Sequence, residues 1–221
     1  MTEAEHQLIF AALQRAVVEM NPEAARQAAR QAVTSGAPPL AAITEGLAAG
    51  MRLVGDKFSC GEYYVPEVLA AARALNIGME ILKPHLPTQT LDSRKRAILA
   101  VVKGDIHDIG KNIVKLFWES AGYEVLDLGK NVPLEKCLEA VQEYHPAAVG
   151  LSTLMTTTLP VMEKTVKELR NHSFQGLKIL VGGASVTPDW ASSIGADFYG
   201  QDGASALEGL RRLIGPPLDA S

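Results

Sequence analysis

The chain has 221 residues, a formal net charge of −4 and 47% hydrophobic residues, enough for two small domains that each have a core. Its basic residues are scattered, without a cationic arm or stripe, so we do not expect nucleic-acid binding. The two cysteines, Cys60 and Cys137, lie far apart in the sequence. Their separation argues against a disulfide framework and against a thiolate zinc site.

The first ten residues, MTEAEHQLIF, lack the basic region and apolar stretch of a signal peptide. No apolar run approaches the roughly 20 residues that a helix needs to span a bilayer. We therefore expect a soluble, cytoplasmic protein without a membrane partner.

Residues 1–84 have the pattern of helices alone. The first predicted helix covers residues 8–19. Asn21 and Pro22 then provide an N-cap and a first helical residue for a second helix that ends near residue 34. Asn21-Pro22 and the turn at residues 35–39 therefore predict that short connections join the helices.

Two further helices are predicted over residues 40–59 and 65–82, because apolar side chains recur there three and four positions apart. Cys60 and Gly61 separate them. Four helices joined by short turns predict a four-helix bundle. On the last helix the side chains expected to face inward are Val68, Leu69, Ala72, Leu75 and Met79.

The segment around Pro84 and Pro87 contains little apolar sequence and is predicted to be a linker. We place a helical domain at residues 1–84, the linker at 85–94 and a second domain at 95–221. The prolines make this linker the expected hinge between the two domains.

In the second domain, short apolar runs alternate with helical stretches. The predicted strands are 97–102, 124–127, 147–151, 178–181 and 197–199, and the predicted helices are 109–121, 134–144, 159–171, 188–193 and 203–214. Such alternation predicts a parallel sheet of five strands wrapped by helices, of the Rossmann-like or flavodoxin-like kind. The fold class is therefore α plus α/β.

Ligands of such sheets bind outside the carboxyl ends of the strands, and the loops there are rich in functional groups. The loop after the first strand holds Asp105, His107 and Gly110. The loop after the third strand runs from Ser152 to Thr158, where Thr157 or Thr158 is expected to cap the next helix. The loop after the fourth strand begins with Gly182 and Gly183, which allow close approach to the backbone.

Two common ligand classes fit these loops poorly. The first loop lacks the GxGxxG pattern of dinucleotide-binding proteins, and the sequence after Gly110, Lys111-Asn112, lacks the hydroxyl of a P-loop. An imidazole with a nearby carboxylate is instead suited to bind a metal, because the acid orients the ring. We expect His107 to reach a metal carried by a large cofactor, held in place by Asp105.

At these residues the chain resembles the cobalamin-binding family that includes the corrinoid domain of methionine synthase and the corrinoid proteins of methyltransferase systems. The family pattern DxHxxG, SxL and GG stands here as Asp105-x-His107-x-x-Gly110, Ser152-x-Leu154 and Gly182-Gly183. Residues 54–67 are also similar to the family's helical cap module. The resemblance thus covers nearly the whole chain.

The resemblance implies cobalamin bound without its own base, with His107 as the lower cobalt ligand. It implies a proton relay from His107 through Asp105 to Thr158, where methionine synthase has serine. The cofactor's nucleotide tail would occupy a slot in the sheet domain. The residues implied to line this slot are Gly110, Ser152, Leu154, Thr156, Gly182 and Gly183, with the loop 199–203 closing it.

The resemblance also implies that the helical domain covers the upper face of the cofactor, with Tyr64, Val65 and Val68 as candidate contacts. Core packing is an equally good interpretation of these three residues. The implied function is a corrinoid carrier subunit that is not catalytic alone. It would accept a methyl group from a substrate-specific methyltransferase and deliver it to a second methyltransferase with a folate or thiol acceptor, with a reductive activation protein as a further partner.

Two other interpretations stay open at this point. The chain could be the small subunit of an adenosylcobalamin mutase, although its helical domain argues against this. It could also be a cobalamin-dependent sensor, although it lacks a basic recognition helix.

Overall fold

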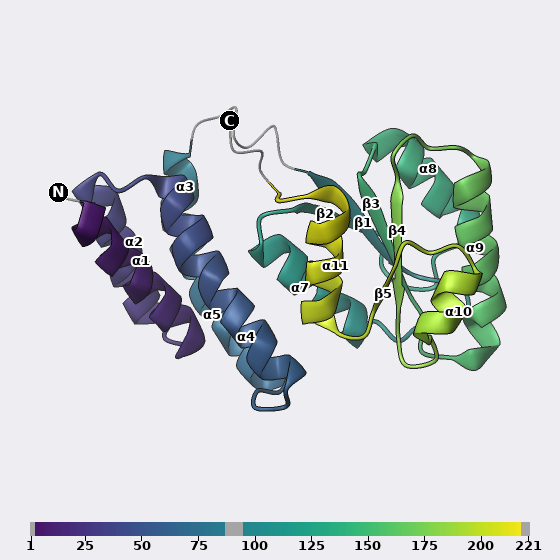
Figure 1. Cartoon of the computed structure of the whole chain (residues 1–221), viewed down its shortest axis with the longest axis horizontal. Helices are drawn as coiled ribbons and strands as arrows, with labels where there is room; N and C mark the ends of the chain where they lie inside the picture. Colours follow the sequence, from purple (N-terminus) through teal and green to yellow (C-terminus); the bar gives the residue numbers. More distant parts are fainter. Residues whose placement is uncertain (1–2, 87–94, 218–221) are drawn as a thin grey trace. The chain divides into compact units, whose positions relative to one another are not determined.

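A computed structural model describes residues 3–86 and 95–217 of the chain. Contacts divide them into two compact units (Figure 1). The first holds the described residues up to 86 together with 120–122, and the second holds the others. Residues 87–94 of the predicted linker lie outside the described residues, so the hinge stays a prediction.

The first unit consists of the expected helices. They are α1 (Glu3–Val18), α2 (Pro22–Ser35), a continuous rod formed by α3 (Pro39–Ala41), η1 (Ala42–Leu47) and α4 (Ala48–Ser59), and α5 (Val65–Leu82), which ends in the 3₁₀ turn η2 (Lys83–His85). The third predicted helix thus contains a π-helical segment, η1, that the sequence pattern did not indicate. The four-helix prediction is confirmed.

Local signals set the bounds of α2. The Asn21 side chain accepts a hydrogen bond of 3.0 Å from the backbone N–H of Ala24, and Pro22 is the first helical residue. Gly36 ends the helix with φ +70°, a left-handed conformation that glycine adopts without steric cost. Both ends of this helix are therefore encoded by single residues.

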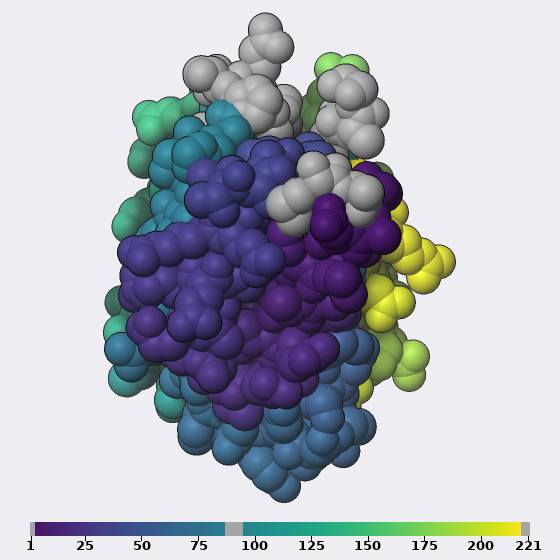
Figure 2. Space-filling view, turned by 90° about the vertical axis from the view of Figure 1, so that its left-hand side faces the viewer, coloured from purple at the N-terminus to yellow at the C-terminus, as the bar shows by residue number. Residues whose placement is uncertain are grey.

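Small residues let the helices of this unit approach closely. A Cβ atom built on Gly50 would lie 2.7 Å from the carbonyl oxygen of Gln14 and 2.8 Å from Cβ of Val17, both on α1. A Cβ on Gly78 of α5 would lie 2.7 Å from the Leu47 side chain. Figure 2 shows the outer surface of the unit, where purple atoms of α1 and α2 adjoin blue atoms of α4 and α5.

One inward-facing residue was predicted wrongly. Leu69 is 56% exposed, whereas its neighbour Val68 is fully buried. Consecutive residues of an α-helix point about 100° apart, so both cannot occupy the centre of the same narrow apolar stripe.

The second unit is built on a parallel sheet with strand order β2-β1-β3-β4-β5. Its strands are β1 (Arg96–Val101), β2 (Glu124–Asp127), β3 (Ala148–Ser152), β4 (Lys178–Gly182) and β5 (Phe198–Gly200). The chain reverses its direction across the sheet between β1 and β3. In doubly wound sheets, ligands bind at this topological switch point, outside the carboxyl ends of the strands.

Helices cover both faces of the sheet (Figure 1). They are α7 (Ile109–Ser120), α8 (Leu134–Tyr144), α9 (Leu159–Asn171), α10 (Pro188–Ser193) and α11 (Gly203–Ile214). One core joins α8, α9 and α10 to alternate strand residues such as Ile98, Val149 and Ile179. On the opposite face, α7 packs on Gly150, where an added Cβ would lie 2.9 Å from the Trp118 ring. The predicted fold class is confirmed.

Two smaller expectations concern cysteines and membranes. Cys60 and Cys137 are both free thiols, as their separation predicted. Within the described residues, no helix combines the length and apolar character needed to cross a membrane.

Candidate functional site

Asp105 lies in the loop after β1, and its fully buried carboxylate accepts five hydrogen bonds. Oδ1 accepts from the backbone N–H of His107 at 2.9 Å and from Nδ1 of its ring at 2.8 Å. Oδ2 accepts from the Thr153 hydroxyl at 2.9 Å and from the backbone N–H groups of Leu154 and Met155 at 2.6 and 3.2 Å. The carboxylate therefore joins the loop after β1 to the loop after β3.

Two opposing effects act on the pKa of Asp105. Burial raises the pKa, because it disfavours the charged form. The hydrogen bonds from the backbones of His107 and Leu154, and then from the side chains of His107 and Thr153, lower the pKa. The hydrogen bonds outweigh the burial, so the pKa lies well below its usual range and Asp105 is ionised at neutral pH.

An ionised carboxylate can only accept hydrogen bonds, so Nδ1 of His107 carries the proton that it donates to Asp105. In a neutral imidazole the other nitrogen, Nε2, then holds a lone pair. The His107 side chain is 49% exposed. The loop thus presents an oriented imidazole with its metal-binding nitrogen on the side away from Asp105.

Two hydroxyl groups extend the network behind Asp105. The Oγ1 atoms of Thr153 and Thr158 lie 2.5 Å apart, and both residues are buried. Thr153 donates to Asp105, and the Thr158 hydroxyl is also a donor to the Met155 carbonyl oxygen at 2.9 Å. The chain of contacts therefore runs from His107 through Asp105 and Thr153 to Thr158.

This arrangement corrects two expectations. Thr158 contacts Asp105 through Thr153, a residue that the family pattern left unspecified between Ser152 and Leu154. Thr158 also occupies the N-cap position of α9 but makes no side-chain capping hydrogen bond. Its hydroxyl lies instead 2.9 Å from the Met155 carbonyl and 2.5 Å from Thr153.

Four large apolar side chains are exposed, two of them close to His107 in sequence and two in the loop that binds Asp105. Ile106 and Ile109 flank His107 in sequence and are 63% and 71% exposed, and Leu154 and Met155 from the next loop are also exposed. We call these four residues the apolar collar. Exposed apolar clusters of this kind mark ligand or partner surfaces in soluble proteins. Of these four residues only Leu154 was predicted from the sequence, because loop residues show no periodicity.

The glycines of the motif have two different reasons to be glycine. A Cβ on Gly182 would lie 2.6 Å from the Gly200 carbonyl oxygen, and a Cβ on Gly183, at φ +116°, would lie 1.9 Å from the Thr153 carbonyl oxygen. The fold itself therefore requires this pair. Gly110 differs, because a Cβ there would meet nothing within 4 Å. The space beside Gly110 is open to a ligand.

The other predicted slot residues lie at the same edge of the sheet. Ser152 ends β3 and is half-buried, whereas Thr156 begins the 3₁₀ turn η3 (Thr156–Thr158) and is exposed. In the loop 199–203, the Asp202 side chain accepts from the backbone N–H of Ser205 at 2.8 Å and caps α11. The structure thus gives this loop a structural role at the start of α11.

The predicted cap contacts belong to the first unit. Tyr64 is exposed just before α5, where its backbone N–H donates to the Glu67 side chain at 2.9 Å. Val65 is half-buried and Val68 is fully buried. Of the three candidates, Tyr64 offers the most accessible surface.

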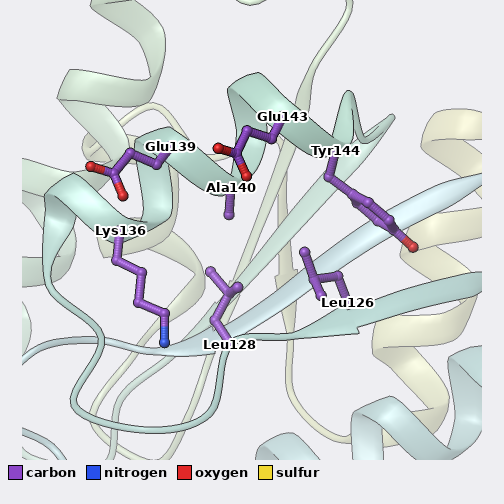
Figure 3. A pocket seen from close by; sticks show the side chains of 7 residues that line it. All are labelled: Leu126, Leu128, Lys136, Glu139, Ala140, Glu143 and Tyr144. Atoms are coloured by element: carbon purple, nitrogen blue, oxygen red, sulfur yellow. The ribbon is translucent and has the colours of Figure 1, made fainter.

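A cleft of about 490 Å³ lies elsewhere in the second unit, between α8 and the edge strand β2 (Figure 3). Its lining residues are Leu126, Leu128, Lys136, Glu139, Ala140, Glu143 and Tyr144. No residue of the motif lines it, so its volume does not identify it with the candidate site.

The donor set restricts the kind of metal ligation that His107 can provide. The described residues contain no cluster of three or more His, Cys, Asp or Glu side chains able to hold a metal ion. A free ion of zinc type needs three or four protein ligands. A single oriented imidazole instead fits a metal whose other ligands come from a macrocycle, and the apolar collar and the space beside Gly110 fit the body of such a cofactor.

Comparison with known proteins identifies such a cofactor. Residues 95–211 match the family model described as B12 binding domain, and residues 9–83 match a second model of the same description. The trimethylamine corrinoid protein 1 of Methanosarcina acetivorans is 36% identical over 214 residues, which cover 96% of this chain and 99% of that protein.

Two solved structures are also similar. A cobalamin-binding protein from Desulfitobacterium hafniense has a TM-score of 0.80 at 32% identity, with 93% of this chain and 98% of that chain covered. A chain of the methanol:cobalamin methyltransferase complex from Methanosarcina barkeri has a TM-score of 0.79 at 28% identity, with 99% and 87% covered. The family resemblance of the motif is therefore confirmed, and the chain belongs to the family of B12-binding corrinoid proteins.

Proposed function

We propose that this chain is a methyl-carrying corrinoid subunit that binds cobalamin with its own base displaced and His107 as the lower ligand. When bound, cobalamin supplies a cobalt atom that accepts and releases a methyl group. The observation that carries the proposal is the 2.8 Å contact of Asp105 with Nδ1 of a half-exposed His107, with the exposed apolar collar residues on the neighbouring loop positions. The proteins to which the chain is similar support a carrier over a mutase subunit or a sensor.

The chain's own residues have separate tasks in this proposal. His107 provides the nitrogen ligand, and Asp105 fixes the ring and keeps the proton on Nδ1. Thr153 and Thr158 hold the hydroxyl chain that stabilises the ionised Asp105. The apolar collar shields the ligand bond from water. The slot residues implied by the resemblance, Gly110 among them, would hold the displaced tail.

The partners follow from the carrier role. A substrate-specific methyltransferase would load the subunit, and a second one, with a folate or thiol acceptor, would unload it. A reductive activation protein and a cytoplasmic location complete the proposal. The methyl donor stays open, because one similar protein is named for trimethylamine and another belongs to a methanol complex. Upper-face contact of Tyr64 and Val65 stays part of the proposal.

Spectroscopy of the reconstituted full chain tests the ligand assignment. The protein is loaded anaerobically with cobalamin, reduced to the cobalt(II) state and studied by electron paramagnetic resonance. We expect nitrogen hyperfine splitting from an imidazole, with a shift in the pattern when the histidines are labelled with ¹⁵N. His107→Ala should abolish the labelled splitting.

His172→Ala is the matched control. His172 is also exposed, and its Nδ1 also has a fixed partner, the Glu168 carbonyl oxygen at 2.8 Å, but it lies just after α9. The control should keep the wild-type spectrum. Labelled splitting that persists in His107→Ala would refute the assignment.

A further inference from the structure

Asn131 has a special backbone position in the loop after β2. Its φ is +54°, in the left-handed region that few residues other than glycine adopt, and Asn is among those that tolerate it best. Neither the motif nor the proposed carrier function assigns a role to this residue. In this conformation both its backbone N–H and its side chain form hydrogen bonds with the neighbouring loop after β1.

Both polar ends of Asn131 hold the segment that precedes His107. Oδ1 of Asn131 accepts a hydrogen bond of 2.8 Å from the backbone N–H of Gly104. The backbone N–H of Asn131 donates to the carbonyl oxygen of Asp105 at 2.9 Å. Asn131 thus spans the two residues whose backbone sets the position of the Asp105 side chain.

The loop that carries Asn131 is itself fixed to the sheet. The backbone N–H of Val101 donates to the Gly129 carbonyl at 3.0 Å, and the N–H of Val132 donates to the Val101 carbonyl at 3.0 Å. The Asp127 side chain accepts from the N–H of Gly129 at 2.9 Å. Asn131 therefore connects the loop after β1 to a loop that is itself hydrogen-bonded to strand β1.

We infer that Asn131 is a positioning residue for the cofactor ligand: it fixes the backbone of Gly104 and Asp105, so that the carboxylate holds the His107 ring in the orientation needed to reach cobalt. This inference rests on the proposed function. The inference goes beyond the proposed function because it assigns ligand orientation to a residue outside the motif, in the loop that follows the strand next to β1.

Two substitutions separate the side chain from the backbone conformation. Asn131→Gly keeps the left-handed φ and removes the acceptor for the Gly104 N–H. Asn131→Asp keeps an acceptor oxygen and a residue type that tolerates this φ. His145→Gly is the matched control, because His145 also has a left-handed φ, +49°, at the far end of α8.

The first measurement uses the cofactor-free full chain. Amide hydrogen exchange of the Gly104 N–H reports directly on the bond to Asn131. We expect exchange about tenfold faster in Asn131→Gly, wild-type exchange in His145→Gly and largely restored protection in Asn131→Asp. Unchanged exchange at Gly104 in Asn131→Gly would overturn the inference.

The second measurement uses the cobalamin-loaded variants and the labelled-histidine spectrum. The fraction with coordinated imidazole should fall by about threefold or more in Asn131→Gly and recover in Asn131→Asp, while the thermal midpoint stays near that of His145→Gly. Faster exchange with an unchanged coordinated fraction would leave Asn131 a local structural residue and overturn its positioning role. If His107→Ala matches the wild type, the proposed function fails first, and the inference fails with it.

Discussion

The two units bury different chemistry. Five of the six buried polar and charged side chains of the described residues belong to the sheet unit, and they are Asp105, Lys111, Thr153, Thr158 and Thr165; the sixth, Ser120 at the end of α7, is grouped with the first unit. Within residues 3–86 the buried side chains are apolar, and many of them are alanines. Burying a polar group costs free energy unless hydrogen bonds compensate it. The sheet unit thus buries polar groups in and near its candidate site, where hydrogen bonds compensate the cost. The helical unit instead depends on close packing of small apolar side chains.

The largest expected effect tests the polar side of this comparison. Lys111 is 1% exposed at its side chain, and its ammonium lies 2.7 and 2.6 Å from the two carboxylate oxygens of Asp127. Asp127→Asn leaves a buried ammonium without its counter-charge and should lower the free energy of unfolding by about 3–5 kcal/mol. Denaturant unfolding followed by tryptophan fluorescence measures it, because Trp118 and Trp190 are the two tryptophans of the chain and both lie in the sheet unit.

The double variant Lys111→Met, Asp127→Asn is the control. It removes both charges, so it should recover part of the lost stability. An equal free energy of unfolding for Asp127→Asn and the wild type would mean that this ion pair does not stabilise the sheet unit.

The next effect depends on pH. The pKa of Asp105 is lowered in the folded protein from the ordinary value of 3.8. Its stabilisation is therefore fully present above pH 3.8 and is lost as the pH falls below that value. The difference in the free energy of unfolding between the wild type and Asp105→Asn should narrow there by up to about 1.4 kcal/mol per pH unit. Fluorescence unfolding at pH 3–6 measures the slope, and a constant difference would contradict it.

A third effect tests the packing side. Gly50→Ala places a methyl group against the backbone of Gln14 and the Val17 side chain on α1, so we expect destabilisation by about 1–3 kcal/mol. Thermal unfolding followed by circular dichroism at 222 nm measures it. Gly50, Gln14 and Val17 carry no ionisable side chain, so the difference from the wild type should stay flat between pH 4 and 6. Stability equal to the wild type would show that α4 can move away from α1 at no cost.

The smallest stability effect is expected at Gly110, the second residue of α7, where an added Cβ meets nothing within 4 Å. Gly110→Ala should change the free energy of unfolding by no more than about 1 kcal/mol, in the stabilising direction, because alanine favours the helix. Cobalamin affinity, measured by titration, should nevertheless fall if the cofactor lies against this residue. Unchanged affinity would remove Gly110 from the proposed slot.

The sequence predicted elements well where one local rule decided them. The five strands were recognisable because each is a short apolar run; α2 began where Asn21-Pro22 indicated, and α5 began at the predicted residue 65. The π segment η1, which packs against α1, was not predictable, because the apolar spacing of the sequence is that of an ordinary α-helix.

The site was predictable where spacing along the chain carried the information. The contact between Asp105 and His107 spans two residues, and the family pattern contains it. Thr153 and Asn131 escaped prediction, because their partners lie 48 and 27 positions away and are brought near only by the order of β1, β2 and β3 in the sheet. The exposure of Leu69 beside the buried Val68 was equally a property of packing.

All five hydrogen bonds on Asp105 come from groups of the protein itself, in the loops after β1 and β3. The conformational entropy of this loop is thus given up during folding rather than during capture of the corrinoid. The binding site is then preorganised, so orienting the His107 ring costs little free energy when a corrinoid binds.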